Sequence, residues 1–159
     1  FENPQIANYE ILGYNWRMST ITAALGISQI QKLDRLIKLR KENAKYITER
    51  ISKFQEITPP NVPEGYEHIY QMYTIRLKNQ KLRDGLHDFL IKKQIFSKIY
   101  FSPIHTTSFY KRKFPTDNTL LPITEKISEE VLTLPMYPNM TNEEKNFLID
   151  SISEFFEKE

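Results

Sequence analysis

The fold is organised by the stretch Gly13-Tyr14-Asn15-Trp16-Arg17-Met18-Ser19 and by the helix that the sequence predicts after it. Glycine allows backbone conformations that other residues avoid, and Ser19 is a suitable N-cap. After the cap, apolar residues recur at helical spacing along one face, namely Ile21, Leu25, Ile30, Leu33, Ile37, Ala44, Ile47, Ile51 and Phe54. The pattern predicts one long helix from about Thr20 to Phe54, which would present the polar loop before it to a ligand or to another subunit.

The bulk composition indicates one domain with a hydrophobic core and excludes several classes of function. Of the 159 residues, 40% are apolar and 13% are aromatic, and 22 basic and 20 acidic residues leave a net charge of +2. The overall charge therefore gives no reason to expect a nucleic-acid or membrane partner, and no apolar run approaches the ~20 residues that a membrane-spanning helix needs. The absence of cysteine excludes disulfides and thiolate metal sites, and no spacing suggests another metal site.

The chain begins with Phe1 rather than methionine, and its first residues read like the middle of a protein. We expect it to be the C-terminal domain of a larger protein, the alternative being a processed or tagged chain. The predicted elements, in order, are an extended lead-in over residues 1–12, the long helix, a proline-rich connector over 58–63, a strand over 67–77, a helix over 81–93, a strand over 95–101, a loop over 102–107, a helical turn over 109–114, a turn over 115–118, a helix over 122–132, a strand over 134–138 and a last helix that opens with the capping box 141–144. This order predicts a small α/β domain whose short sheet is covered by helices.

The three histidines are the first candidates for chemistry. His87 lies inside a predicted helix and is interpreted as a surface or packing residue, whereas His68 precedes a strand without an evident partner. His105 lies in a loop after a predicted strand, where functional residues collect, and its position alone leaves a functional and a structural role equally open. No Gly-rich phosphate loop and no nucleophile–histidine–acid arrangement is present. The residues by themselves therefore indicate an α/β domain with two polar loops, residues 14–17 and 100–105.

These loops resemble a known family. The segment from Gly13 to Gln29 is similar to the GYNxRM…AAxGxxQ segment of the DegT/StrS-type sugar aminotransferases, which are fold-type-I enzymes dependent on pyridoxal phosphate. The resemblance continues through Leu33, Asp34 and Arg40 in the long helix and through the strand at 68–77. It includes the Y-x-x-P-x-H loop at 100–105, with Tyr110, and the closing LPMYPxMT segment at 134–141. The resemblance extends over almost the whole chain, with four motifs in the same order.

The resemblance implies the architecture of the family's C-terminal part. Residues 1–18 would be a lead-in and active-site loop from a large domain that is not in this chain. Residues 19–57 would be a long connecting helix, and residues 58–159 a small domain with a short, mainly antiparallel three-stranded sheet. It also implies a homodimer in the cytoplasm, with Ala23, Ala24 and Gly26 near the two-fold interface.

The resemblance also implies roles for individual residues. Asn15 would donate to the phosphate of the cofactor in the neighbouring subunit, which suits a side-chain amide, or it would only shape the turn. Arg17 and Tyr14 would face the substrate in the shared active site, although an interface ion pair is an equally open reading of Arg17. His105, with Tyr100 on the same loop, would contact the nucleotide sugar.

Two departures from the family pattern matter. The lysine that holds the cofactor lies upstream in the family, and no lysine of this chain has a context that could replace it, so we expect the chain alone to be inactive. Gln94 stands where the family usually has glycine after a helix, which suggests a somewhat different turn.

The full-length protein is thus expected to move an amino group, usually from glutamate, onto a nucleotide-linked keto-sugar in polysaccharide biosynthesis. Its partners would be the sugar substrate and the amino donor, without nucleic acid, membrane or metal. A pyridoxal-phosphate-dependent sugar dehydratase and a non-catalytic interaction module of the same fold remain open as alternatives.

Overall fold

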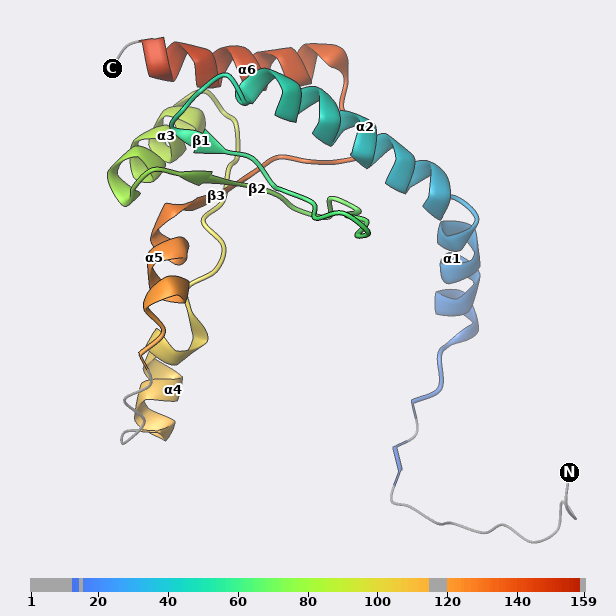
Figure 1. Ribbon diagram of the computed structural model, residues 1–159. Helices are drawn as coiled ribbons and strands as arrows, with labels where there is room; N and C mark the ends of the chain where they lie inside the picture. The colour runs from blue at the N-terminus through green and yellow to red at the C-terminus, as the bar shows by residue number, and fades with distance from the viewer. Residues whose placement is uncertain (1–12, 15, 115–119, 158–159) are drawn as a thin grey trace, which may run out of the picture. The chain divides into compact units, whose positions relative to one another are not determined.

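The computed structural model describes residues 13–14, 16–114 and 120–157, and the chain divides into two compact units, Phe1–Asp34 and Arg35–Glu159. Within the described residues the elements are, in chain order, α1 (Thr20–Ile30), α2 (Leu33–Ile51), β1 (Ile57–Thr58), β2 (Tyr73–Leu77), α3 (Gln80–Lys92), the 3-10 turn η1 (Ile104–Thr106), α4 (Ser108–Lys113), α5 (Pro122–Glu130), β3 (Val131–Leu134) and α6 (Asn142–Glu157) (Figure 1). The predicted α/β class with a short antiparallel three-stranded sheet is confirmed. The lead-in at 1–12 and the turn at 115–118 lie outside the described residues.

The predicted long helix is two helices. Its start is confirmed, because Ser19 has an extended backbone and its Oγ accepts a hydrogen bond from the Thr22 amide at 3.2 Å. The continuous helix from Thr20 to Phe54 is wrong at Gln31 and Lys32, where α1 ends before α2 begins. There the Lys32 amide donates to the Gln29 carbonyl at 3.0 Å. A bond to the third preceding residue tightens the turn and ends the regular α-helical ladder.

The sheet has the order β1-β2-β3, and both pairs are antiparallel. β2 is the central strand and buries Tyr73, Ile75 and Leu77, the alternating face that the sequence predicts. The strand expected over 67–77 begins only at Tyr73, since the chain before it is bent: Tyr70 has a φ of 52°. The Arg40 guanidinium binds the carbonyls of Tyr70 at 2.9 Å and Gln71 at 3.3 Å, so these groups are not available to a neighbouring strand.

The other two strands differ from the prediction. β1, next to the proline-rich connector, was not predicted, because two residues are too short to show a period. The strand expected over 95–101 is reduced to a single bridge between Lys98 and Thr133, since Ile95 and Ser97 are buried but Ile99 and Phe101 are exposed, and the alternation that a strand needs is lost. β3 lies at 131–134 rather than at 134–138, because Pro135 and Pro138 cannot donate hydrogen bonds to a strand.

The hydrophobic core of the second unit lies between the sheet and three helices. Its fully buried members include Ile47 and Ile51 of α2, Leu86 and Leu90 of α3, and Ile152 of α6. The helices hold one another by polar contacts at the edge of the core: the Tyr46 hydroxyl donates to Asn146 at 2.6 Å. Buried Asn43 donates to the carbonyls of residues 137 and 138 at 3.0 and 3.1 Å, which fastens α2 to the chain that leaves β3.

Two ion pairs, each with one buried member, lie where α5 meets the sheet and α3. The carboxylate of Glu130, which is buried, accepts from Arg76 Nε on β2 at 2.6 Å. Arg83 of α3 is also buried; it pairs with Asp84 at 2.6 Å and donates to the Ser128 carbonyl at 3.2 Å. Truncating the exposed member of such a pair leaves an uncompensated buried charge, which is costly. The C-terminal end of α5 is therefore held from two directions. The helix predicted over 122–132 ends two residues earlier, at Glu130, where β3 begins.

In the described part of the chain, no helix is both long enough and apolar enough to cross a membrane. Within the same residues, no group of three or more His, Asp or Glu side chains is placed to hold a metal ion.

Candidate functional site

The first predicted loop presents exposed polar and aromatic side chains before α1. The rings of Tyr14 and Trp16 stack with centroids 5.2 Å apart and planes 5° from parallel, and both are largely exposed. Arg17 is exposed, and within the described residues its guanidinium forms no hydrogen bond or ion pair. Asn15, the residue predicted to reach the cofactor phosphate, lies outside the described residues. An exposed, unengaged guanidinium is suited to an anion such as a phosphate or a carboxylate.

The second predicted loop is shaped by local hydrogen bonds around His105. The loop leaves the sheet at Lys98, whose amide and carbonyl both bond to Thr133 of β3, at 2.9 and 2.8 Å. The Thr106 hydroxyl then donates to the Pro103 carbonyl at 2.8 Å, and the Thr107 hydroxyl to the Ile104 carbonyl at the same distance. These bonds close the 3-10 turn η1, in which His105 is the central residue.

His105 is paired with a carboxylate that the sequence analysis missed. Its Nε2 lies 2.9 Å from Oε1 of Glu125 in the first turn of α5. The same oxygen accepts the Leu121 amide at 3.4 Å. The hydrogen bond from His105, and then that from Leu121, lower the pKa of Glu125 below its ordinary value. A lone glutamate separated from the histidine by 20 positions gives no spacing signal that could have found the pair.

His105 lines an open cavity of about 510 Å³. The other residues that line it are Phe101, Ser102, Pro103, Ile104, Tyr110, Leu121 and Thr124. Tyr100 does not line the cavity but stacks on Phe101, which does, with ring centroids 4.5 Å apart. A mostly apolar cavity with one imidazole is the kind of surface that binds a small organic ligand.

The four described candidate residues fall into two groups. Tyr14 and Arg17 belong to the unit Phe1–Asp34, and Tyr100 and His105 to the unit Arg35–Glu159. Within the second unit, His105 and Phe101, on which Tyr100 stacks, line the same cavity. His87, interpreted as a packing residue, is half-buried with Nδ1 2.9 Å from the Ser97 hydroxyl.

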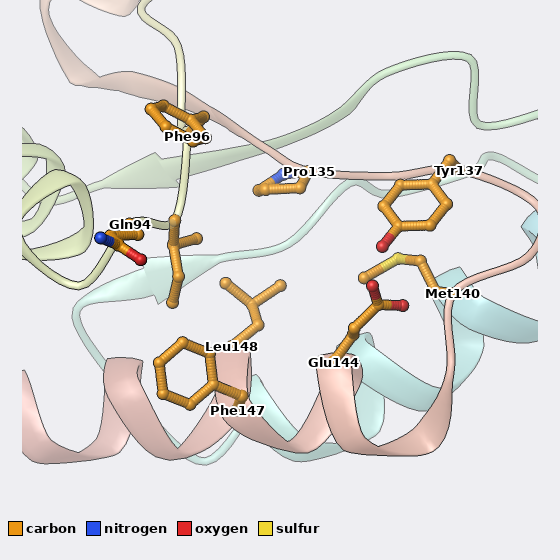
Figure 2. A pocket seen from close by; sticks show the side chains of 9 residues that line it. Gln94, Phe96, Pro135, Tyr137, Met140, Glu144, Phe147 and Leu148 are labelled. Carbon is orange, nitrogen blue, oxygen red and sulfur yellow. The ribbon is translucent and has the colours of Figure 1, made fainter.

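A second concavity, of about 280 Å³, lies between α6 and the chain around Pro135 (Figure 2). Most of its lining side chains are apolar, namely Ile95, Phe96, Pro135, Met140, Phe147 and Leu148. At one side the phenol of Tyr137 points toward the carboxylate of Glu144. Hydrogen bonding with Glu144 raises the pKa of Tyr137 to about 12. The two ionisable groups that line this concavity are already paired with each other. They are therefore less available to bind a ligand than the imidazole in the His105 cavity.

The described lysines differ from a residue that would hold a cofactor covalently. Such a lysine is buried, so that its ammonium loses a proton easily. None of the described lysines is buried, and the half-buried ones are Lys41, Lys93 and Lys145. Lys41 pairs with Glu67, and Lys93 with Glu154. Lys145 donates to Asn43 at 3.2 Å.

The family and the fold are shown by comparisons with known proteins. A sequence model of the DegT/DnrJ/EryC1/StrS aminotransferase family matches residues 2–153. GDP-perosamine synthase of Escherichia coli O157:H7 is 28% identical over 148 residues, which are 93% of this chain and 39% of that protein.

Solved structures agree as well. The Helicobacter pylori aminotransferase PseC, described as involved in pseudoaminic acid biosynthesis, matches with a TM-score of 0.84 at 22% identity, over 100% of this chain and 43% of its own. DesV of S. venezuelae matches with a TM-score of 0.83 at 23% identity, over 96% and 40% of the two chains. At these identities the structures show a shared fold, and the chain spans about two fifths of each relative.

Proposed function

Because the chain belongs to the DegT/DnrJ/EryC1/StrS aminotransferase family, we propose that it is the C-terminal part of a pyridoxal-phosphate-dependent aminotransferase acting on a nucleotide-linked keto-sugar. The observation that carries the proposal is the family match over residues 2–153. The substrate class is supported by the relative named for GDP-perosamine, a nucleotide-linked sugar. We propose glutamate as the amino donor and the cytoplasm as the location, and we expect neither nucleic acid nor membrane as a partner.

The loop before α1 would serve the cofactor and the substrate of a neighbouring subunit in a homodimer. Its donors suit an anionic group: the amide of Asn15, the exposed guanidinium of Arg17 and the phenol of Tyr14 can all donate hydrogen bonds to phosphate oxygens. Arg17 suits this role because no described residue already occupies it. When bound, the cofactor would supply an electron sink for the carbon that exchanges its amino group. The part contributed by this loop is binding and orientation.

The His105 cavity would bind part of the nucleotide sugar. Its apolar walls exclude water from one side of a ligand, while the imidazole supplies a directional hydrogen bond. Tyr100 would support the cavity through its stacking on Phe101 rather than through direct contact. The lysine that binds the cofactor would come from a part of the protein outside this chain, and we propose that residues 1–159 alone neither bind the cofactor covalently nor transfer amino groups.

The test uses the full-length protein. After incubation with pyridoxal phosphate and reduction with borohydride, the intact mass should rise by one reduced cofactor per chain, mapped to a lysine upstream of Phe1. Glutamate should then be consumed only when a nucleotide-linked keto-sugar is present. Saturable cofactor binding without a covalent adduct would instead favour the sugar dehydratase, and no binding at all would leave a non-catalytic interaction module. The same treatment of residues 1–159 is the control and should give no adduct.

A further inference from the structure

We infer that Glu125 is a positioning residue for His105: its carboxylate holds the imidazole through Nε2 and leaves Nδ1 to accept a hydrogen bond from a hydroxyl or N–H group of a ligand in the cavity. The inference rests on the proposed function in one respect, since it takes this cavity as part of the substrate site. It adds the residue that decides which imidazole nitrogen meets the ligand.

The proton assignment follows from the chemistry of the pair. An ionised carboxylate can only accept hydrogen bonds, so the nitrogen 2.9 Å from Glu125 Oε1 must carry a proton. In a neutral imidazole the other nitrogen then has a free lone pair. No described residue forms a hydrogen bond with Nδ1 of His105. As far as the described residues are concerned, the neutral ring that lines the cavity therefore carries one unused acceptor.

The charges around Glu125 favour its ionised form. The bonds from His105 and Leu121 lower its pKa below the ordinary value of 4.5 against the opposing effect of burial. The positive charge of a protonated His105, and then the ammonium of Lys111 on α4, act in the same direction as the two bonds. Glu125 is thus a carboxylate at neutral pH, as the assignment requires. The other ionisable group that lines the cavity is the phenol of Tyr110.

The segments that carry the two partners both connect to β3. α5 runs directly into β3 and is anchored at its end by Glu130 to Arg76 at 2.6 Å. The loop with His105 starts from the Lys98 bridge to Thr133 on the same strand. Because both segments connect to one strand, β3 places Glu125 and His105 close to each other, and the hydrogen bonds within η1 orient the loop that carries His105.

The tautomer can be read directly by NMR without any ligand. The chain has three histidines, so two-bond ¹H–¹⁵N correlations of the ¹⁵N-labelled chain give six ring-nitrogen shifts, assigned by replacing each histidine in turn. In the neutral form of the ring we expect His105 to show a protonated Nε2, an unprotonated Nδ1 and a slowly exchanging Nε2–H resonance. Glu125→Ala should abolish that resonance and shift both ring nitrogens of His105.

The matched control is Glu129→Ala, which removes another exposed carboxylate from the same helix and should leave the His105 signals unchanged. The signals of His68 and His87 report whether a variant is folded. A proton on Nδ1 instead of Nε2 in the parent, or unchanged His105 signals in folded Glu125→Ala, would overturn the inference. If Glu125→Ala does not fold, the test is made with Glu125→Gln. Faster exchange of the His105 Nε2–H with water in this variant than in the parent supports the inference, and an unchanged exchange rate contradicts it.

The proposed enzyme function and the proposed role of Glu125 can be contradicted independently of each other. Loss of the covalent cofactor adduct would end the proposed enzyme reaction but would not change the tautomer of His105. A wrong tautomer would end the role of Glu125 while the full-length protein could still transfer amino groups.

Discussion

Gln94 adopts a left-handed backbone conformation, with a φ of 62°, although it carries a Cβ. It follows the end of α3, where the Ile95 amide donates to the Leu90 carbonyl and the Gln94 amide to the Ile91 carbonyl, both at 2.9 Å. This pair of bonds is the Schellman motif, which glycine usually closes because the left-handed region carries no steric penalty for it. The structure therefore shows the glycine-type turn made by glutamine, at the position where the resemblance implies glycine, and the different turn expected there from the sequence is wrong.

At this residue we predict that Gln94→Gly stabilises the domain. A residue with a Cβ in the left-handed region costs about 1–2 kcal/mol. Glycine removes this cost, but it also raises the conformational entropy of the unfolded chain, which offsets part of the gain. The free energy of unfolding should therefore rise by roughly 0.5–1 kcal/mol. Urea unfolding measures it. Gln94→Ala is the control, because it shortens the side chain but keeps the Cβ, and it should bring no gain. Equal effects of both variants would show that the backbone conformation is not the cause.

The residue scale also shows where sequence reasoning stops. His105 could be selected because it follows a proline in a loop after a predicted strand. Glu125 could not, since a glutamate in the first turn of a helix is explained by the helix dipole alone. Its pairing with His105 depends on the tertiary placement of α5. His105, Asn15, Arg17, Tyr14 and Tyr100 all stay predictions as site residues.

At the scale of the element, the start of α6 is the part of the fold that the sequence describes best. The capping box is confirmed: the Glu144 amide donates to the Thr141 hydroxyl at 3.2 Å, and the Thr141 amide donates to the Glu144 carboxylate at 2.8 Å. The structure adds a third member, Tyr137, whose hydroxyl bonds to Glu144 (Figure 2). The bond from Tyr137, and then that from Thr141, lower the pKa of Glu144 below its ordinary value of 4.5.

We predict that Glu144→Gln destabilises the domain at neutral pH but not in acid. A carboxyl group whose pKa is lower in the folded than in the unfolded state stabilises the fold above the unfolded pKa, and this contribution is lost as the pH falls through the folded pKa. The urea midpoints of parent and variant should therefore differ at neutral pH and converge below 4.5, the ordinary pKa of the group.

Asp150→Asn serves as control for this prediction, because it removes an exposed carboxylate from the same helix without touching the cap. A difference between parent and Glu144→Gln that persists unchanged into acid would mean that the charge of Glu144 contributes nothing. Tyr137→Phe should destabilise at neutral pH in the same direction, because it removes the donor.

Strands were harder to predict than helix starts. Helix caps are local: Ser19, Asn79 and Thr141 each bond to an amide three residues ahead. α3 accordingly begins at Gln80, one residue before its predicted start. A strand, in contrast, needs a neighbour. The aromatic and β-branched segment at 95–101 has strand propensity but pairs at Lys98 alone, whereas β1, with two residues, pairs fully with β2.

At the scale of the whole molecule, the buried core lies in the unit Arg35–Glu159. Every buried residue of the described chain belongs to that unit, and α1 contains none. Burial of apolar surface is the main stabilising contribution to folding. The second unit should therefore fold without the first.

We predict that a chain of residues 35–159 unfolds in urea with the same midpoint and the same slope as the whole chain. The slope should be unchanged because it scales with the surface exposed on unfolding, and the two free energies of unfolding should agree within about 1 kcal/mol. As a positive control, Ile152→Ala should cost about 2–5 kcal/mol in both chains, because it opens a cavity among fully buried side chains. A much lower midpoint for the shorter chain would show that residues 1–34 contribute to the core.

The boundaries at residues 18 and 57 that the resemblance implies for the domains stay a prediction. The structure divides the chain instead between Asp34 and Arg35. This contact-based division falls within the segment predicted as a connecting helix, close to the interruption at Gln31 and Lys32. The apolar side chains of α1, including Ile21, Leu25 and Ile30, are exposed in the chain by itself, and we propose that they pack in the full-length homodimer.

The sequence by itself determined the class of fold, the starts of the capped helices α1, α3 and α6, and the family, because these depend on periodicity, on caps that act over three residues and on motifs that stay contiguous along the chain. Only the tertiary structure decided which segments pair in the sheet, where the long helix is interrupted and which carboxylate meets His105. The physical reason is range: strand pairing and the contact of His105 with Glu125 join residues far apart in sequence, and their free energy depends on packing that no local pattern encodes.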